Sequence, residues 1–374
     1  MEIRRPTWAE IDLSAIKHNI AVLRAYLKPS TRFMAVVKAN AYGHGVMEVA
    51  NVCAANGVDF LGVATLDEAM PLVEAGIKLP ILVLGYVPGE FAEQVIEHDI
   101  RTVVYEEGYA RELSRAAQRL GKDALIHFKI DTGMGRLGFP DDDAGIAAVV
   151  GIAALPGIRA EGLMTHFAES DSPQRDYTSQ QIQRFMAFNR ELEKQGLHIA
   201  IKHCGNSAAI VSYPEAHLDM VRAGIMLYGL YPAPSMKALN LDIIPAMTLK
   251  SRVSFVKTLP CGESVSYGRT YTCSEDTEVA TIPIGYADGY NRLLSNRAYA
   301  MIKGIKAPLI GTVCMDQCMF ALPKGSNVQT GDEVILFGRP EDGITADDLA
   351  NLIGTINYEI VTTITSRVPR TYKP

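Results

Sequence analysis

The sequence lacks an apolar run long enough to cross a membrane. Its longest uncharged apolar stretch, residues 144–158, contains glycines and Pro156 and is shorter than the roughly 20 residues that a spanning helix needs. The first eight residues include basic side chains, but no apolar segment follows them, so we predict no secretory signal. We therefore expect a protein without a membrane partner.

An excess of positive charge is also missing. Lysine and arginine total 36 against 42 aspartate and glutamate residues, which gives a formal net charge of −6. This balance argues against a nucleic acid or an anionic membrane as the partner. With 374 residues, of which 48% are hydrophobic and 21% charged, the chain is typical of a globular enzyme of two domains.

The cysteines show no spacing typical of a disulfide framework. Six are spread from Cys53 to Cys318. Cys314 and Cys318 are close in sequence, but no histidine or second cysteine pair lies near them, so we predict no metal site. Unpaired thiols fit a reducing compartment, and we expect the protein in the cytoplasm.

Between residues 32 and 228, short apolar runs alternate with segments of helical periodicity. Helices are expected at residues 13–27, 45–56, 67–75, 108–120 and 174–195, the first capped by Asp12 or Ser14. Strands are expected at residues 33–37, 60–64, 81–84, 102–105, 125–130, 162–165, 199–203 and 219–222. Eight such repeats predict an α/β fold with an N-terminal (β/α)8 TIM-type barrel, and an open doubly wound sheet is the alternative.

After about residue 234 the pattern changes to short β-branched segments separated by glycine, proline and aspartate. Strands are expected at residues 253–259, 278–283, 300–302, 308–311, 319–321 and 333–337, and a helix at 345–353. These segments predict a C-terminal, mainly β domain. We expect the barrel over residues 12–236 and the β domain over residues 237–374, joined by an N-terminal strand within residues 1–11.

Polar side chains gather where the predicted barrel strands end. Lys38 follows the first strand, and Arg222 ends the eighth. Lys129 lies in the fifth strand with Arg136 after it, and His166 follows the sixth. Because the active sites of such barrels lie at the carboxyl ends of the strands, we expect these side chains to share one site.

Lys38 directly follows four apolar residues. Burial lowers the pKa of an amine and leaves a nucleophile that can form a Schiff base with an aldehyde cofactor. The alternative is a strand-end lysine that reaches solvent or pairs with a carboxylate. On this context alone, the sequence leaves both interpretations open.

The loops after the seventh and eighth predicted strands could bind a phosphate group. Ser207 can cap a helix and donate to a phosphate, and Gly224, followed by Ile225, allows close approach of the backbone. Ordinary loop capping is the alternative. Together with Lys38, these loops indicate a cofactor that carries both an aldehyde and a phosphate.

Residues 133–138 match the G-x-G-x-x-G pattern of dinucleotide-binding proteins. In those proteins the glycines open directly into a helix. Here they run into Phe139-Pro-Asp-Asp-Asp143, so a lone match of this kind is weak. We interpret the glycines as shaping a loop that presents Arg136.

Longer motifs resemble the alanine racemases, a family of fold-type III pyridoxal-phosphate enzymes. The similar segments cover essentially the whole chain and include residues 35–45, 129–138, 165–168, 206–208, 222–229, 266–271, 284–290, 314–317 and 357–360. The resemblance implies a barrel joined to a β domain, pyridoxal 5′-phosphate as cofactor, and a homodimer whose active sites are shared across the interface. It also implies interconversion of L-alanine and D-alanine, which supplies D-alanine for peptidoglycan.

The resemblance further implies a role for individual residues. Lys38 would hold the cofactor as a Schiff base and exchange the proton on the D face, and Tyr267 of the partner subunit would be the base on the opposite face. Arg222 would face the pyridine nitrogen, and His166 would link this arginine towards the tyrosine. A tyrosine with the ordinary pKa of about 10 is a poor base at neutral pH, so it needs such a neighbour.

The binding residues follow in the same way. The phosphate would be bound by Tyr42, Ser207, Gly224, Ile225 and Tyr358. Arg136 and the Met315 N–H would bind the substrate carboxylate, and Lys129 stands where many members carry a carbamylated lysine. The entrance to the site would be lined by Asp171, Arg292 and Ile356.

Other functions remain open at this stage. A related racemase could accept serine or a broader range of amino acids. A decarboxylase on the same fold would need an apolar pocket around the carboxylate, against which Arg136 argues. A non-enzymatic cofactor-binding barrel would lack the domain that carries Tyr267 and Met315. A dinucleotide-dependent oxidoreductase is the most distant alternative.

Overall fold

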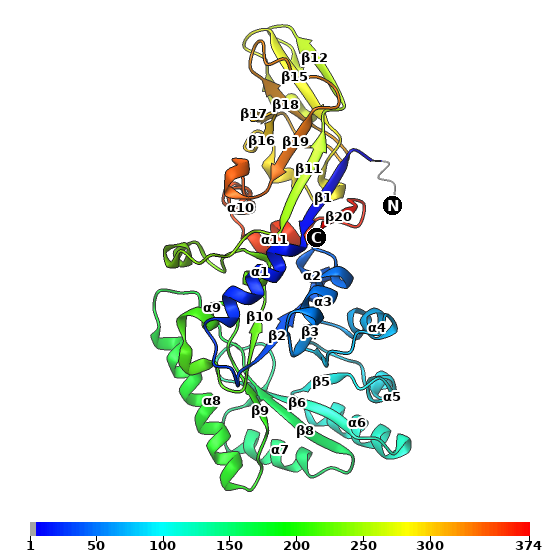
Figure 1. Ribbon diagram of the computed structural model, residues 1–374, viewed down its shortest axis with the longest axis vertical. Helices are drawn as coiled ribbons and strands as arrows, with labels where there is room; N and C mark the ends of the chain where they lie inside the picture. The colour runs from blue at the N-terminus through cyan, green and yellow to red at the C-terminus, as the bar shows by residue number, and fades with distance from the viewer. Residues whose placement is uncertain (1–4) are drawn as a thin grey trace. The chain divides into compact units, whose positions relative to one another are not determined.

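The computed structural model describes residues 5–374 and divides them into two compact units (Figure 1). The barrel unit comprises Lys17–Ala41 and Val46–Ile243. The β unit comprises the described residues up to Ile16, together with Tyr42–Gly45 and Ile244–Pro374. The boundaries expected from sequence, 12–236 and 237–374, stay predictions. Residues 1–4 of the expected N-terminal strand lie outside the described part.

A parallel sheet of eight strands forms the centre of the barrel unit, in the order β10-β2-β3-β4-β5-β6-β8-β9. Between the outermost strands, the N–H of Asp219 donates to the Lys202 oxygen (3.1 Å) and that of Arg222 to the Gly205 oxygen (2.9 Å), so the barrel is nearly closed. The predicted (β/α)8 barrel is therefore confirmed. The strands are β2 (Arg32–Val36), β3 (Phe60–Val63), β4 (Ile81–Val83), β5 (Arg101–Val104), β6 (Ala124–Asp131), β8 (Ile158–Met164), β9 (Ile201–His203) and β10 (Met220–Ala223), with the short β7 (Phe139–Pro140) paired to β6.

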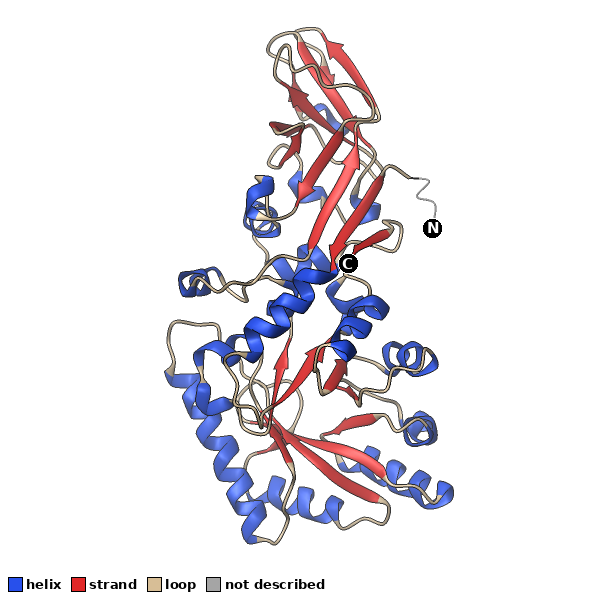
Figure 2. Ribbon diagram, viewed as in Figure 1, coloured by secondary structure: helices blue, strands red, loops and turns tan. Residues whose placement is uncertain are grey.

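Helices alternate with these strands along the chain and surround the sheet (Figure 2). Asp12 caps the first helix, because its Oδ1 accepts the Ala15 N–H at 3.0 Å. The α-helices are α1 (Leu13–Arg24), α2 (Lys38–Tyr42), α3 (Val46–Ala55), α4 (Leu66–Glu74), α5 (Ala92–Glu97), α6 (Glu107–Leu120), α7 (Asp143–Ala153), α8 (Asp176–Lys194) and α9 (Ser207–Ser212). The 3-10 helices of this unit are η1 (Gly89–Phe91), η2 (Pro214–Ala216), η3 (Ile225–Tyr228) and η4 (Pro234–Leu239).

Large apolar side chains pack together in the barrel core. One comes from each of seven strands, and burial of each contributes about 1.5–3 kcal/mol. These residues are Met34, Phe60, Leu82, Val103, Met164, Ile201 and Met220. The remaining strand, β6, contributes the buried His127, whose ring lies edge-on to Phe60 at a centroid distance of 6.2 Å. A polar group thus enters the core at this strand.

The β unit is built on a sheet of nine strands in the order β12-β15-β18-β17-β16-β19-β11-β1-β20. The N-terminal strand expected within residues 1–11 is present as β1, which pairs antiparallel with β11 and parallel with β20. The strands are β1 (Thr7–Asp12), β11 (Met247–Arg252), β12 (Phe255–Leu259), β15 (Thr277–Ile282), β16 (Tyr299–Ile302), β17 (Ile305–Ile310), β18 (Cys318–Leu322), β19 (Glu333–Phe337) and β20 (Arg370–Lys373), and a hairpin is formed by β13 (Ser264–Val265) and β14 (Tyr271–Thr272). The expected mainly β architecture is confirmed.

Short helices connect the strands of the β unit. The helix expected at residues 345–353 is α10 (Ala346–Ile353), whose N-cap Thr345 forms a capping box with Asp348. The others are α11 (Asn357–Thr362), η5 (Tyr267–Arg269), η6 (Tyr286–Asp288), η7 (Arg292–Leu294) and η8 (Pro340–Asp342). Within residues 5–374, no helix has the length and apolarity that a membrane span requires.

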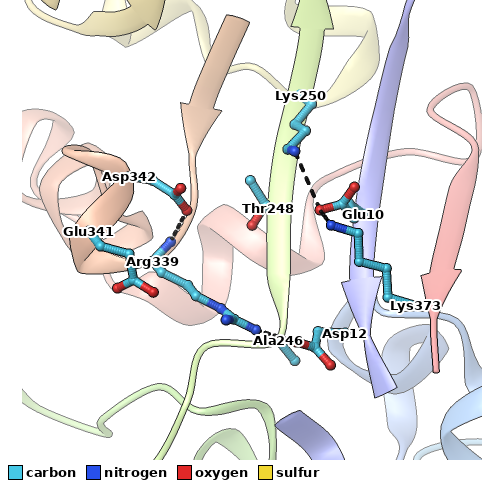
Figure 3. Close-up of a pocket in the computed structure, with 9 residues that line it drawn as sticks. All are labelled: Glu10, Asp12, Ala246, Thr248, Lys250, Arg339, Glu341, Asp342 and Lys373. Carbon is cyan, nitrogen blue, oxygen red and sulfur yellow. Dashed lines mark hydrogen bonds and ion pairs between the residues drawn. The ribbon is translucent and has the colours of Figure 1, made fainter. Parts of the chain in front are cut away.

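A charged pocket of about 210 Å³ lies in the β unit (Figure 3). Glu10 forms ion pairs with Lys250 (3.4 Å) and Lys373 (2.6 Å), and Asp12 forms one with Arg339. The pocket is lined by Glu10, Asp12, Ala246, Thr248, Lys250, Arg339, Glu341, Asp342 and Lys373. Because its lysine and arginine side chains are already paired with carboxylates, we interpret it as a connection between β1 and its neighbours.

Candidate active site

Lys38 lies at the start of a left-handed turn. Ala39, Asn40 and Ala41 have φ of 53° and Tyr42 has φ of 51°, which L-residues other than glycine adopt at a cost of about 1–2 kcal/mol each. Glu68 supports the turn, since its two carboxylate oxygens accept the N–H groups of Ala39 and Ala64, both at 2.7 Å. Strained backbone of this kind is concentrated at functional sites. The turn therefore fixes where the Lys38 side chain starts.

The environment of Lys38 favours the neutral amine. Burial lowers the pKa of Lys38, the positive charge of Arg136 lowers it further, and Glu68 acts in the opposite direction. A neutral amine is the form that attacks an aldehyde. This electrostatic setting is the one expected of a nucleophilic lysine, and the role of Lys38 stays a prediction.

Arg222 is 3% exposed and lies in β10, with both terminal nitrogens fully engaged. Nη1 donates to the backbone oxygen and the Nδ1 of His203, both at 3.0 Å. Nη2 donates to the oxygens of Thr165 (2.9 Å) and Cys204 (3.0 Å) and to His166 Nδ1 (3.1 Å). In the described chain the Arg222 Nε–H has no acceptor, so it is available to a ring nitrogen.

Beyond Arg222, a line of hydrogen bonds runs through the barrel core. His203 Nε2 lies 2.8 Å from His127 Nδ1, and His127 Nε2 lies 3.2 Å from a Glu161 oxygen. Arginine can only donate and a carboxylate can only accept, so both imidazoles must carry their proton on Nε2. Every bond in this core relay, Arg222–His203–His127–Glu161, then points the same way.

The histidines around Arg222 are held neutral. Burial lowers the pKa of His166 and His203 well below the ordinary value, and the charge of Arg222 lowers both further. Burial also lowers the pKa of His127, although Glu161 opposes it. Burial would raise the pKa of Glu161, but hydrogen bonds from His127 and Arg101 outweigh it and bring the pKa to about 2. The relay thus holds one positive charge and one negative charge at opposite ends.

Lys129 is buried in β6, and of the described atoms none bonds its Nζ. Burial, and then the charges of Arg222 and Arg136, lower its pKa to about 8. A buried amine without a partner is unusual, because it loses its hydration without compensation. Such an amine is available for chemical modification or for a bound group.

Two short helices begin side by side at Ser207. Ser207 Oγ accepts the N–H groups of Gly224 (2.8 Å) and Met226 (3.4 Å), at the start of η3. The expectation that Ser207 caps α9 is wrong, because Ser207 is the first residue of that helix and Asn206 is its cap, accepting the Ala209 N–H at 3.1 Å. The starts of two helices and one hydroxyl therefore meet at one point, an arrangement that suits a phosphate.

Four of the predicted catalytic and binding residues belong to the β unit, as do Arg292 and Ile356 of the predicted entrance. The Tyr42 and Tyr358 rings lie 6.1 Å apart, and burial raises the pKa of Tyr42 to about 12. Tyr267 and Met315 are 72% and 52% exposed. Lys38, Lys129, Arg136, His166 and Arg222 are all in the barrel unit, where Arg136 is exposed on the glycine loop.

The structure adds residues that the sequence did not single out for a role. His127, His203 and Glu161 form the relay, and Glu68 supports the turn after Lys38. A histidine in each of two strands expected to be apolar, at positions 127 and 203, is the sequence signal for the relay. Among residues 5–374, no group of three or more His, Cys, Asp or Glu side chains could hold a metal ion.

Fold and site together define a class of protein: a barrel enzyme with a β domain, in which a lysine follows the first barrel strand and an arginine ends the last. Two family models match the chain, "Alanine racemase, N-terminal domain" over residues 11–232 and "Alanine racemase, C-terminal domain" over residues 246–372. The chain belongs to the alanine racemase family.

Similar proteins cover the chain almost completely. It is 50% identical over 371 residues to an alanine racemase of Clostridium perfringens, covering 99% of this chain and 96% of that protein. An alanine racemase of Methanococcus maripaludis is 45% identical, covering 99% of each. Among solved structures, an alanine racemase of Clostridium difficile 630 has a TM-score of 0.95 at 41% identity, covering 100% of this chain and 97% of that one. The alanine racemase of Bacillus anthracis with bound L-Ala-P has a TM-score of 0.95 at 35% identity, covering 100% and 96%.

Proposed function

We propose that this enzyme interconverts L-alanine and D-alanine with pyridoxal 5′-phosphate as cofactor, and so supplies D-alanine for peptidoglycan. The observation that carries the proposal is the buried Arg222 between neutral histidines, in the same unit as a lysine of lowered pKa. Membership of the alanine racemase family supports it. We also propose a cytoplasmic location, with which the six free thiols agree.

The described residues fit this cofactor. Lys38 would bind its aldehyde, and the donors at Ser207, Gly224 and Ile225, with Tyr42 and Tyr358, would hold its phosphate. The Arg222 Nε–H would donate to the pyridine nitrogen. When bound, the cofactor withdraws electrons from the substrate and makes the proton on Cα acidic. Because arginine only donates hydrogen bonds, Arg222 would leave the ring nitrogen unprotonated.

Proton exchange needs one base on each face of Cα. Lys38 Nζ would hold or release the proton on the D face, and Tyr267 of the partner subunit would do so on the opposite face. His166 accepts from Arg222 at Nδ1, so its proton lies on Nε2, which can donate to the phenolate and stabilise it. A neutral His166 keeps this arrangement in one tautomer.

Substrate binding would use Arg136, which can form two hydrogen bonds to a carboxylate, and the Met315 N–H of the β unit. We propose that Lys129 is carbamylated. A carbamate would convert a lone buried amine between two arginine charges into an anion, which would pair with the guanidinium of Arg136.

A homodimer is part of the proposal. The β unit exposes large apolar side chains that a monomer would leave in water. These include Tyr267, Tyr286, Leu293, Met315 and Ile356. They support a surface on which a second copy packs, with Tyr267 and Met315 completing the partner's active site.

The proposed function is tested with the purified enzyme and L-alanine in deuterated water. We expect D-alanine to form and both enantiomers to acquire deuterium at Cα, while Lys38→Arg loses exchange on the D face. Serine and larger amino acids are run in parallel, because exchange only with these would identify a related racemase instead. No exchange with any amino acid would exclude racemisation.

A further inference from the structure

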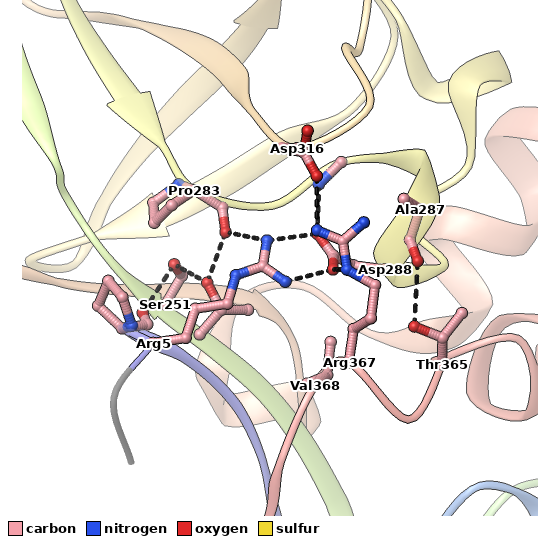
Figure 4. A network of polar contacts seen from close by, with 12 residues as sticks. Arg5, Ser251, Pro283, Ala287, Asp288, Asp316, Thr365, Arg367 and Val368 are labelled. Atoms are coloured by element: carbon pink, nitrogen blue, oxygen red, sulfur yellow. Dashed lines mark hydrogen bonds and ion pairs between the residues drawn. The ribbon is translucent and has the colours of Figure 1, made fainter.

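Asp288 is a fully buried carboxylate in the β unit (Figure 4). It pairs with Arg5 through both oxygens, with Nη2 at 2.6 Å. It also accepts the Gly285 N–H at 3.0 Å and lies 3.4 Å from Arg367 Nε. Three hydrogen bonds and one further ion pair therefore surround this carboxylate, which compensates its buried charge.

The turn that carries Asp288 contacts the loop of residues 314–316. The N–H of Tyr286 donates to the Cys314 oxygen and that of Ala287 to the Met315 oxygen, both at 3.1 Å. A Cβ on Gly285 would lie 2.3 Å from these two oxygens, so turn and loop approach each other too closely for any other residue. The Met315 peptide is thus held by its carbonyl group.

Arg367 provides a second connection to the same loop. Its Nη2 donates to Asp316 Oδ1 at 2.5 Å, while its Nε faces the buried Asp288 (Figure 4). An exposed ion pair between Arg367 and Asp316 would be weak by itself. Here the guanidinium is fixed at its other edge by a buried charge, so it can hold Asp316 in one place.

We propose that Asp288 is a positioning residue for substrate binding. Through its turn and through Arg367 it holds the 314–316 loop so that the Met315 N–H faces the substrate carboxylate. This inference rests on the proposed function, in which that N–H binds the carboxylate. In the described chain the Met315 N–H donates to no other group, so it is available for this bond.

The test compares two arginine variants of the whole enzyme. Arg367→Met and Arg5→Met each remove one partner of Asp288, but only the first disconnects Asp316. We expect Arg367→Met to raise KM for alanine about two- to fivefold with kcat little changed, the size expected of one exposed ion pair. Arg5→Met should lower the melting temperature and leave KM unchanged. Asp316→Asn should raise KM as Arg367→Met does.

Hydrogen exchange gives a readout that does not depend on turnover. The amide protons of Tyr286 and Ala287 should exchange faster in Arg367→Met and Asp316→Asn than in Arg5→Met. An unchanged KM and unchanged exchange in both loop variants would overturn the proposal, as would an equal rise of KM in all three variants. If the unaltered enzyme does not racemise alanine, the proposed function fails, and the exchange measurement alone still decides whether Asp288 holds the loop.

Discussion

At the scale of single residues, a full set of hydrogen bonds explains how a buried guanidinium is tolerated. Among the described residues, Arg222 contacts no carboxylate directly. Its five acceptors are backbone oxygens and imidazole nitrogens, and the relay leads from it to Glu161, whose own ion partner is Arg101 at 3.1 Å. Each bond of the relay fixes the proton of the next ring. A carboxylate outside the immediate site therefore contributes to the orientation of the arginine proposed to face the cofactor.

We predict that Glu161→Gln reduces kcat about tenfold, the effect of ~1.4 kcal/mol in the barrier. An amide can donate as well as accept, so it no longer forces the proton of His127 onto Nε2. Nitrogen-15 NMR of the histidines should show a single tautomer for His127 in the unaltered enzyme and a mixture in the variant, while Arg222 still holds His203 in one tautomer. Glu93→Gln, which removes the exposed partner of Arg119, is the matched control and should change neither measurement.

Glu161 should also make the free energy of unfolding depend on pH. Its folded pKa is depressed, so its contribution is complete above the unfolded pKa of about 4.5 and is lost as pH falls towards 2. Denaturant unfolding at pH 7 should therefore show Glu161→Gln to be less stable than the unaltered protein. At pH 3 the difference should become smaller, and a difference that grew on acidification would contradict this sign.

At the scale of secondary structure elements, the turn α2 holds four consecutive left-handed residues after Lys38. Its first three residues, Lys38, Ala39 and Asn40, lie partly or fully in solvent. Packing therefore does not impose the left-handed conformation on these residues. Two hydrogen bonds impose it: the Ala39 N–H donates to Glu68, and the Val46 N–H donates to Asn40 Oδ1 at 2.9 Å.

We predict that Ala39→Gly stabilises the protein by up to about 1 kcal/mol. Glycine relieves the left-handed strain but loses more chain entropy on folding, so the net gain is smaller than the strain itself. Ala39→Val should be destabilising, since a β-branched residue tolerates positive φ poorly. Chemical unfolding of both variants measures the difference, and a less stable glycine variant would argue against a left-handed turn.

The sequence predicts some helices and strands better than others, for physical reasons. The barrel strands are short apolar runs, because both faces of a parallel sheet are buried, and all eight were found. The helix α7 was missed since its largely apolar sequence hides the helical period, and α11 since it is rich in β-branched residues. β11 was missed because one of its buried positions is a serine, Ser251, which bonds Thr7 Oγ1 at 2.7 Å.

Some residues of the candidate site can likewise be predicted from the sequence and others cannot. Lys38, Arg222 and the Ser207 loop lie in contiguous motifs at strand ends, so spacing was enough to select them. Glu161 and His127 are 34 positions apart in the sequence and meet because their side chains point toward each other from two neighbouring strands. No local sequence pattern predicts such a contact. The left-handed turn is likewise invisible, because its residues are alanine and asparagine rather than glycine.

At the scale of the whole molecule, the proposed active site is complete only in a dimer, because Lys38 and Tyr267 would come from different copies. This sharing of residues between two chains can be tested by mixing variants. Lys38→Ala and Tyr267→Ala are each expected to be inactive alone. In a mixed dimer, one site would regain both intact residues and the other would lose both.

We predict that mixing equal amounts of these two variants, after dissociation and reassociation, restores about one quarter of the unaltered activity. Half of the dimers would be mixed, and each would have one working site of two. Racemisation measured against protein concentration should fall at dilution as dimers separate. If Tyr267 acted on Lys38 of its own chain, mixing would restore nothing.

The pairing of β1 with β11 and β20 has a consequence for synthesis on the ribosome. β1 is made first, but its partners begin 240 and 363 residues later, at Met247 and Arg370. At ~5–20 residues per second, β1 waits roughly 12–50 s for β11 with both edges unpaired. The barrel segments emerge during that interval. The edges of β1 stay unpaired until translation reaches the β unit, so they need protection from pairing with other nascent chains.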